Sequence, residues 1–276
     1  MENKIGIVGF GNMGSAIGQR LKPKYQIIAF DKDKNKTDNL AGIALAGNIT
    51  DLLSRAGIVI LAVKPQDFDN VLREIKNCAA EKLIISIAAG ITTGYIERVL
   101  GKVKVIRVMP NIGVKIGEAE SSLCRGRYAS NKDLSFAKGL FDCLGKTWIM
   151  KEEMIDAVTA ITGSGPAYIY YDMEIKKIDP RDVPIEIEQE YIRRLKRAAE
   201  RVGFDSQTAL DLAGCTTAST IRLSAAVGIP PAELRKQVTS KGGTTEAALK
   251  VLMEGGSWEE AAVAAKKRAE ELSKKE

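Results

Sequence analysis

The sequence contains no histidine at any of its 276 positions. This absence excludes every mechanism in which an imidazole acts as a general base, including Ser-His-Asp triads and Cys-His pairs. Cysteine is also scarce, because Cys78, Cys124, Cys143 and Cys215 stand far apart and form no CxxC pair. Without paired cysteines or histidine ligands we expect no metal site, and we interpret the cysteines as buried free thiols.

Long hydrophobic runs are missing as well. The longest, Leu83 to Ile91, has nine residues, whereas a membrane-spanning helix needs about 18 or more. The first residues do not have the apolar stretch and small-residue cleavage site of a signal peptide. We therefore expect a soluble, cytoplasmic protein that does not bind a membrane.

Size and charge favour two unlike halves. A chain of 276 residues with 45% hydrophobic residues exceeds what one core usually fills, so we expect two domains. Residues 1–150 carry 22 basic against 14 acidic side chains, whereas residues 151–276 carry 19 against 21. The positive first half suits an anionic cofactor. Nucleic acid is the rival partner, but the basic residues are scattered and match no nucleic-acid motif, so we expect none.

A glycine-rich turn directly follows the first apolar segment. KIGIVGFGNMGSAIG (residues 4–18) runs from a β-branched strand through GxGxxG into a helix, the order that a dinucleotide pyrophosphate site needs. Gly9 permits the sharp turn, Gly11 leaves room for the phosphate, and Gly14 lets helix and strand pack closely, while free amides at the helix start face the anion. A glycine turn in an ordinary α/β protein is the alternative. The cofactor site expected here comprises Gly9, Gly11, Asn12, Met13 and Gly14.

Asp31 closes the next apolar run, Ile27 to Phe30, where the adenosine ribose of a dinucleotide would bind. Its carboxylate would accept hydrogen bonds from the 2′ and 3′ hydroxyls and repel a 2′-phosphate, which favours NADH. Lys32, Lys34 and Lys36 favour NADPH instead, since any of them could neutralise its 2′-phosphate. We expect NADH or NADPH as the cofactor, with a preference for NADH.

Further strand and helix segments alternate as far as residue 150. We expect strands at 58–63, 83–88, 103–108, 121–124 and 147–150, and helices at 92–100 and 131–144. Continuous apolar strands are typical of a parallel sheet that is buried on both faces, and ligands bind at the carboxyl ends of its strands. Ala62, Val63, Lys64 and Pro65 should therefore lie against the cofactor, although a solvated loop position explains the Lys64 side chain equally simply.

From Lys151 onward the strand-like runs disappear and an alanine-rich helical pattern takes over. The fold class predicted is α/β, with a Rossmann-type doubly wound parallel sheet in residues 1–150 and an all-α substrate and dimerisation domain in residues 151–276. The small residues of the helix at 209–226 suit either a core position or a subunit interface. Helices are expected at 152–161, 191–202, 206–226, 231–238, 245–253 and 257–275.

One segment of the helical half differs from its surroundings. Asp172 to Glu190 contains Pro180 and Pro184, which forbid one continuous helix, and seven acidic against three basic residues. We interpret it as an inserted, exposed excursion, after which a helix restarts near Tyr191.

Two other stretches interrupt the helical pattern with glycine. Thr162 to Tyr168 (TGSGPAY) has two glycines and a proline between apolar helical segments. Val238 to Glu246 (VTSKGGTTE) places a glycine turn directly before a helix, and its unpaired amides could form a carboxylate-binding nest. An ordinary helix cap at Thr244 or Thr245 would explain the second stretch without a ligand.

Six segments together resemble the pyrroline-5-carboxylate reductase family and occur in the family's order over almost the whole length. They are GIVGFGNMGSAI (6–17), ILAVKPQ (60–66), SIAAGI (86–91), RVMPN (107–111), DAVTAITGSGPAYIY (156–170) and VTSKGGTTEAALKVLMEGG (238–256). The resemblance implies reduction of a cyclic imino acid, 1-pyrroline-5-carboxylate, to L-proline with NAD(P)H, the last step of proline biosynthesis. A related imine or hydroxy-acid dehydrogenase and a non-enzymatic nucleotide sensor are the alternatives.

The resemblance also implies roles for individual residues. Thr245 matches the threonine that is proposed to bond the ring nitrogen and assist protonation, so it is the expected catalytic residue. The expected substrate-binding residues are Gln237, Ser240, Gly242, Gly243, Thr244 and Thr245. The expected residues around the nicotinamide are Ala62, Val63, Lys64, Pro65, Ile87, Ala89, Pro110 and Asn111, and the ribose side adds Asp31 and Lys32.

Family members are dimers through interlocked carboxyl-terminal helices and often form decamers, so the resemblance implies a homodimer or a higher homo-oligomer. One subunit's cofactor would then meet its partner's GGTT turn. Two departures affect these expectations. Lys241 replaces a family proline in the substrate turn, and the segment 172–190 falls where the family continues a long dimer helix.

Overall fold

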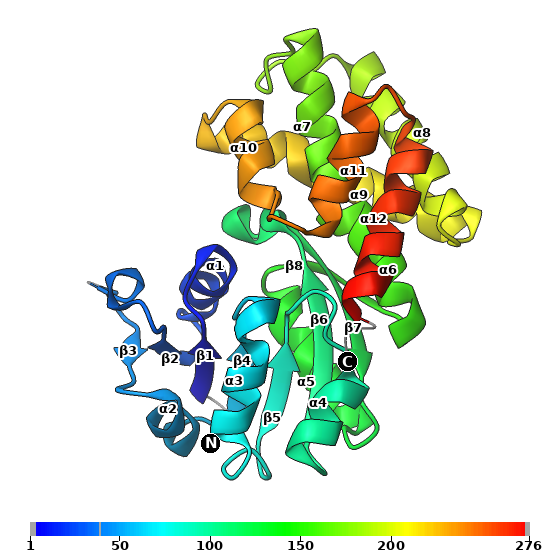
Figure 1. The fold of residues 1–276 in the computed structure, drawn as a ribbon. Coiled ribbons are helices and arrows are strands. Elements are labelled where there is room, and N and C mark those ends of the chain that lie inside the picture. Colours follow the sequence, from blue (N-terminus) through cyan, green and yellow to red (C-terminus); the bar gives the residue numbers. More distant parts are fainter. Residues whose placement is uncertain (1–3, 39, 274–276) are drawn as a thin grey trace. The chain divides into compact units, whose positions relative to one another are not determined.

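The computed structural model describes residues 4–38 and 40–273 of the chain (Figure 1). Within these residues, eight strands form one sheet in the order β3-β2-β1-β4-β5-β6-β7-β8. None of the described helices is long and apolar enough to cross a bilayer. The strands are β1 (Lys4–Val8), β2 (Gln26–Phe30), β3 (Ala44–Leu45), β4 (Ile58–Leu61), β5 (Leu83–Ser86), β6 (Lys104–Pro110), β7 (Ala119–Arg125) and β8 (Gly145–Ile149).

The first six strands pair in parallel, as expected of a doubly wound sheet. β1 lies between β2 and β4, so the order of the strands reverses around it. The crevice at such a reversal is where open α/β sheets bind ligands, and the glycine turn leaves β1 at that point. The α/β fold class predicted from the sequence is confirmed.

β7 departs from the expected parallel arrangement. The Asn111 amide donates to the Glu120 carbonyl over 3.0 Å, and the Gly126 amide donates to the Val105 carbonyl over 2.8 Å. This opposite order along the two strands makes β6 and β7 antiparallel. A short connection, with the 3₁₀ helix η2 (Ile112–Ile116), joins them, whereas a parallel pair would need a longer crossover.

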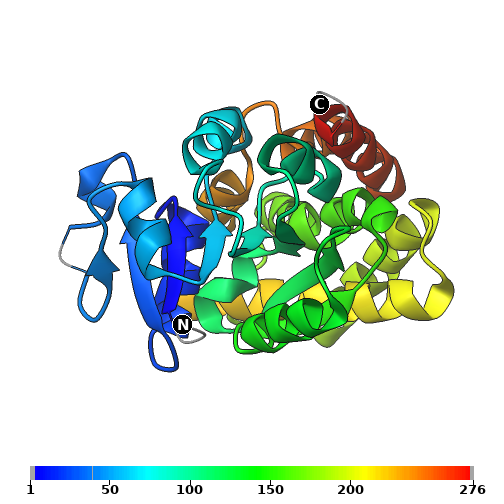
Figure 2. The same cartoon turned by 90° about the horizontal axis from the view of Figure 1, so that it is seen from below.

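Helices cover both faces of the sheet (Figures 1 and 2). α2, α3 and α4 share one core with it, in which Leu52, Phe68 and Ile96 are buried. α1 packs on the opposite face, where Gly18 lies close to Ile7. The helices of this part are α1 (Asn12–Leu21), η1 (Lys34–Lys36), α2 (Ile49–Arg55), α3 (Pro65–Ile75), α4 (Thr93–Leu100) and α5 (Asn131–Asp142).

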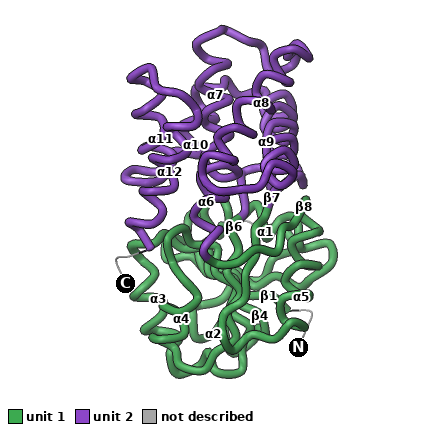
Figure 3. Tube along the Cα trace, turned by 90° about the vertical axis from the view of Figure 1, so that its right-hand side faces the viewer, with its two compact units in different colours: residues 1–109, 121–152, 276 green, residues 110–120, 153–275 purple. Residues whose placement is uncertain are grey.

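The chain divides into two compact units (Figure 3). Of the described residues, 4–38, 40–109 and 121–152 form the α/β unit, and 110–120 and 153–273 form the helical unit. The division expected at residue 150 did not anticipate that residues 110–120 group with the helices. They do so because η2 packs against α9 (Ser206–Val227).

The helical unit is built around Trp258, which is almost completely buried. The rings of Tyr168 and Tyr191 lie 5.8 and 5.7 Å from it between centroids, and the Arg194 guanidinium lies 4.2 Å above its face. Aromatic and cation–π contacts of this kind add to the large apolar burial. The elements of this unit are η3 (Glu152–Met154, shared with the α/β unit), α6 (Ile155–Val158), the π-helical η4 (Thr159–Gly163), α7 (Gly165–Lys176), α8 (Ile185–Arg201), α9, α10 (Pro231–Val238), α11 (Thr244–Met253) and α12 (Trp258–Ser273).

The segment 172–190 is largely exposed and its helix is interrupted, as its prolines predicted, but the interruption is shorter than expected. Only residues 177–184 connect α7 to α8, and α8 begins at Ile185 rather than near Tyr191. The Asp172 carboxylate accepts hydrogen bonds from the Tyr191 hydroxyl (3.0 Å) and from Arg194 (2.9 Å). The acidic and basic residues of this segment therefore hold two helices together, so the prediction was wrong for both of its ends.

Asp172 also shows how this helix pair is held electrostatically. Burial opposes ionisation of the carboxyl, but hydrogen bonds from Lys176 and Arg194 outweigh it and keep the pKa of Asp172 below its usual range. The ionised form is thus favoured in the folded protein. Asp172 contributes stability above its ordinary pKa, and that contribution is lost as the pH falls through the lowered value.

The four cysteines are free thiols, but only Cys124 is fully buried. The other three are partly exposed, so the expectation of burial was wrong for them. The part of the chain that the structure describes holds no grouping of three or more histidine, cysteine or acidic side chains that could bind a metal ion.

Candidate functional site

The glycine turn is closed by contacts that only glycine permits. Gly9 has a φ of +91°, and its amide donates to the Phe30 carbonyl over 2.8 Å. A Cβ at Gly14 would lie 2.0 Å from the Gly9 carbonyl oxygen, which no side chain can tolerate. A Cβ at Gly11 would meet no protein atom within 4 Å. The packing of helix on strand therefore requires Gly14, whereas Gly11 faces open space.

The amino terminus of α1 has the open amides and the charge that suit an anion. Its N-cap is Gly11, which offers no side-chain cap, and no acidic residue lies in the first turn. Within the described residues, no acceptor is found for the amides of Asn12, Met13 and Gly14. Together with the positive end of the helix dipole, these amides can bind a phosphate oxygen.

Asp31 contacts the glycine turn directly. Its Oδ2 accepts a hydrogen bond from the Phe10 amide over 2.7 Å, and its Oδ1 accepts one from Asp33 over 2.9 Å. Lys36 Nζ lies 3.5 Å from the same carboxylate. Lys32 instead forms an ion pair of 2.7 Å with Asp67. Of the lysines weighed in the sequence, Lys36 is thus the one that stands beside Asp31.

The other cofactor residues expected in the α/β unit follow the carboxyl ends of two neighbouring strands. The Ala62 amide donates to the Val8 carbonyl, so the segment after β4 runs beside the glycine turn. Lys64 is the exposed N-cap of α3, and Pro65 is its first residue. Ile87 and Ala89 follow β5 and are partly exposed, and the Ile87 amide donates to the Leu61 carbonyl.

Pro110 and Asn111 belong to the helical unit and are buried. Asn111 Oδ1 accepts hydrogen bonds from the amides of Gly113 (3.1 Å) and Glu120 (3.0 Å). The side chain therefore fixes the turn between β6 and β7. Its Nδ2 is buried without a partner among the described residues, which leaves two N–H donors for another group.

The turn before α11 gathers the residues expected to bind the substrate. The Gly243 amide donates to the Ser240 carbonyl (2.9 Å), and the Gly242 amide donates to Glu246 Oε2 (2.7 Å). Both glycine amides are thus used inside the turn. No acceptor is found in the described structure for the amides of Thr244, Thr245 and Glu246, which begin α11. These three amides can donate hydrogen bonds to a carboxylate.

Residues around the turn hold it in place. Arg268 on α12 donates from Nε to the Gly242 carbonyl over 2.8 Å, and Lys241 is exposed beside it. Gln237 at the end of α10 accepts a hydrogen bond from Lys115 over 2.7 Å. Arg268 therefore holds the backbone of the turn, and Lys115 holds the side chain of Gln237. The sequence offered no signal for Arg268, because it comes from a helix 26 residues further along.

Ser164 is the functional candidate that sequence reasoning did not assign. Its Oγ lies 3.1 Å from Thr244 Oγ1 and 3.2 Å from Thr245 Oγ1, and its side chain is fully buried. The two glycine-containing stretches that interrupt the helical pattern thus meet at one point. The unusual sequence TGSGPAY was the signal, but only the fold joins it to the turn 80 residues away.

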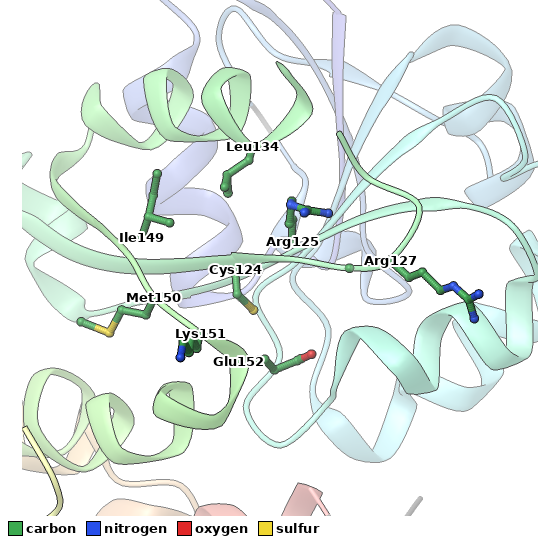
Figure 4. A pocket seen from close by; sticks show the side chains of 9 residues that line it. Cys124, Arg125, Arg127, Leu134, Ile149, Met150, Lys151 and Glu152 are labelled. Carbon is green, nitrogen blue, oxygen red and sulfur yellow. The ribbon is translucent and has the colours of Figure 1, made fainter. Parts of the chain in front are cut away.

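A shallow groove of about 380 Å³ lies elsewhere on the α/β unit (Figure 4). It is lined by the carboxyl ends of β7 and β8 and by Leu134 of α5. None of the residues expected to bind cofactor or substrate lines it. Of its charged side chains, Glu152 is bonded to Thr93 and to the buried Arg107. The groove therefore adds nothing to the candidate site.

The fold and the glycine turn define the class of protein. A doubly wound sheet with open amides in the glycine turn at its strand reversal is a Rossmann-type dinucleotide-binding unit. The helical unit adds a second glycine turn with open amides, where the Glu246 carboxylate lies in the first turn of α11. Residues 4–90 match the family model described as NADP oxidoreductase coenzyme F420-dependent. Residues 189–272 match the one described as pyrroline-5-carboxylate reductase dimerisation.

Similar proteins of known name place the chain in one family of this class. The chain is 35% identical over 289 aligned residues to the pyrroline-5-carboxylate reductase of Methanosarcina acetivorans, and the match covers all of both chains. Among solved structures, a pyrroline-5-carboxylate reductase from Coxiella burnetii is 30% identical with a TM-score of 0.66, and the NADP-bound Plasmodium falciparum pyrroline carboxylate reductase is 25% identical with a TM-score of 0.64. Each covers 99% of both chains. The chain belongs to the pyrroline-5-carboxylate reductase family.

Proposed function

We propose that this protein reduces 1-pyrroline-5-carboxylate to L-proline with NADH or NADPH. The observation that carries the proposal is the turn before α11, where three open amides lie next to the buried Thr245 hydroxyl. This turn offers a carboxylate site and a polar atom for a ring nitrogen within one helical turn. Full-length similarity to reductases that bear this name supports the same substrate.

The α/β unit fits a dinucleotide. The amides of Asn12, Met13 and Gly14 would hold the pyrophosphate, and the open space at Gly11 lets the backbone approach it. Ala62 to Pro65, with Ile87 and Ala89, would line the nicotinamide side. When bound, the reduced nicotinamide supplies the hydride.

Asp31 supports the preference for NADH that we propose. Each carboxylate oxygen already accepts one amide, but a carboxylate has about four acceptor positions and can still receive ribose hydroxyls. Its charge would repel a 2′-phosphate. Lys36 opposes this preference because its ammonium lies 3.5 Å from the carboxylate and could contact that phosphate.

The helical unit would bind the imino acid. The amides of Thr244, Thr245 and Glu246 would hold its carboxylate, with Arg268 and Lys241 contributing positive charge nearby. Thr245 would contact the ring nitrogen. A protonated imine is already electrophilic, so positioning the reacting carbon about 3 to 3.5 Å from the hydride can supply much of the catalysis without histidine.

We also propose that the protein acts as a homodimer or a higher homo-oligomer. Residues 189–272, which match the dimerisation family model, contain α9 with its many small residues. Small side chains allow helices from two subunits to approach closely. The helix pair α7–α8 distinguishes this chain from the uninterrupted helix expected of the family.

Steady-state kinetics with purified protein test the proposed function. NADH and NADPH oxidation would be followed separately with 1-pyrroline-5-carboxylate, and L-proline would be quantified as the product. We expect turnover with both cofactors and a higher kcat/KM with NADH. Consumption of neither cofactor would refute the reductase and leave a nucleotide sensor, whereas activity only with a hydroxy acid would identify a related dehydrogenase.

A further inference from the structure

Three hydroxyls, two of them buried and one partly buried, form one cluster inside the helical unit. Ser164 Oγ lies between Thr244 Oγ1 at 3.1 Å and Thr245 Oγ1 at 3.2 Å. Ser164 is fully buried and Thr245 is 5% exposed. A buried hydroxyl that links two residues of a candidate substrate turn is well placed to fix their rotamers.

The chain positions Ser164 with an irregular backbone. Residues 159–163 are π-helical, and the Ser164 amide donates to the Thr159 carbonyl over 2.9 Å, so an extra residue enters the helix just before it. π-Bulges of this kind are rare and frequently lie at functional sites. Ser164 is the N-cap of α7, and Pro166 is the second residue of that helix.

Neighbouring hydroxyls in the same segment do not take part. Thr159 donates to the Ile155 carbonyl and Thr162 donates to the Val158 carbonyl, both within their own helical segment. Of these three described hydroxyls, that of Ser164 is the one hydrogen-bonded to residues of α11. The irregular backbone therefore delivers one particular hydroxyl to the substrate turn.

The heavy-atom geometry assigns Thr245 as the donor in its contact with Ser164, whereas either oxygen can donate in the contact between Ser164 and Thr244. A serine hydroxyl has one proton, which Ser164 can then direct to Thr244 Oγ1. With its own proton committed to Ser164, Thr245 presents only lone pairs to a ligand. Such an acceptor matches the N–H of a protonated cyclic iminium and does not match an unprotonated imine nitrogen.

We infer that Ser164 is a positioning residue, which orients the Thr245 hydroxyl as a hydrogen-bond acceptor for the N–H of a protonated cyclic iminium substrate. This inference rests on the proposed function. The hydride from the reduced nicotinamide forms the new C–H bond, and the electron pair of the C=N bond moves to the nitrogen. The nitrogen already carries its proton, so Thr245 transfers none and the product leaves as a secondary amine.

A double-mutant cycle tests the inference. The four proteins are the wild type, Ser164→Ala, Thr245→Val and the double variant. We expect Ser164→Ala to lower kcat about 10-fold while the Kd for NADH changes less than twofold. In the Thr245→Val background the same substitution should change kcat less than twofold, because the group that Ser164 orients is gone. Equal effects in both backgrounds would overturn the inference.

Two further measurements separate positioning from support of the fold. Thr162→Val is the matched control, since Thr162 is buried in the same segment but bonds only to its own helix, and we expect its kcat to stay within twofold. Ser164→Cys, which keeps the volume and a weak hydrogen-bonding group, should lie between the wild type and Ser164→Ala. If Thr162→Val lowered kcat as much as Ser164→Ala, the role would be structural.

A solvent isotope effect tests the direction of the Thr245 proton. At a pH where the substrate is fully protonated, kcat/KM should be nearly the same in H₂O and D₂O, since no proton moves in the hydride step. A decrease of twofold or more in D₂O would mean that Thr245 donates. Each outcome that would overturn the inference is measured on an active wild type. It is therefore distinct from failure of the proposed function, in which the wild type has no activity.

Discussion

The carboxylate of Asp31 accepts a hydrogen bond of 2.7 Å from the amide of Phe10. The acidic residue that follows β2 therefore fixes the second position of the glycine turn, and under the proposed function it would also contact the ribose. One side chain would thus affect both the shape of the proposed pyrophosphate site and the choice of cofactor. Its replacement should affect the binding of both cofactors, but to different extents.

Asp31→Ala tests this double role. Loss of the hydrogen bond to Phe10 should weaken NADH binding about 10-fold, which corresponds to about 1.4 kcal/mol. NADPH should lose less affinity, because the repulsion of its 2′-phosphate is also removed. Fluorescence titration with both cofactors gives the two Kd values, and Asp33→Ala is the control on the same loop. An unchanged ratio of the two Kd values would remove Asp31 from cofactor selection.

Gly11 and Gly14 should respond oppositely to the same substitution. Gly14→Ala places a Cβ 2.0 Å from the Gly9 carbonyl oxygen, so the folded protein itself should be strained and its Tm lowered. Gly11→Ala meets no protein atom within 4 Å, so Tm should be unchanged while the new methyl group blocks the phosphate. Thermal unfolding and cofactor titration on both variants check this. Normal cofactor binding by Gly11→Ala would show that the pyrophosphate lies elsewhere.

Thr245→Ala should lower kcat more than it weakens NADH binding. The hydroxyl is expected to contact the reacting ring and not the dinucleotide, so its loss acts on the transition state. We expect a decrease in kcat of about 10- to 100-fold and a Kd for NADH within twofold of the wild type. Unchanged turnover would exclude Thr245 from the mechanism.

The connection between α7 and α8 should be the preferred site of proteolysis in this region. Residues 177–184 lie outside helices, whereas Asp172 and Tyr191 on either side are bonded to each other. Limited trypsin digestion under native conditions should cut at Lys177 or Arg181 before it cuts at Arg194. Mass spectrometry of the first fragments identifies the site. Early cleavage inside α7 or α8 would contradict the helix pair that the structure shows.

The α/β unit could be predicted from the sequence because its signals are local. The glycine turn follows its strand directly, and apolar runs such as Ile58 to Leu61 can be recognised without knowledge of the fold. The antiparallel β7 could not, since its direction depends on pairing between the Asn111 amide and the Glu120 carbonyl. Local pattern does not contain that information.

The helical unit was harder to predict because its polar residues contact residues that are far away in the sequence. The prolines and charges around Asp172 predict an exposed segment. Its carboxylate is nevertheless hydrogen-bonded to Tyr191 and Arg194 of the next helix. The turn before α11 was recognisable from its glycines, but the approach of Ser164 to Thr244 spans 80 residues. Such contacts arise only when the helices pack.

Transfer of a labelled hydride tests the central claim most directly. The wild-type protein would be incubated with NADH that carries deuterium on the transferring face of the nicotinamide, together with 1-pyrroline-5-carboxylate, and the product examined by NMR. We expect one deuterium per L-proline, located on the ring carbon that was double-bonded to nitrogen. Proline without deuterium, or no proline at all while the protein remains folded, would contradict the account.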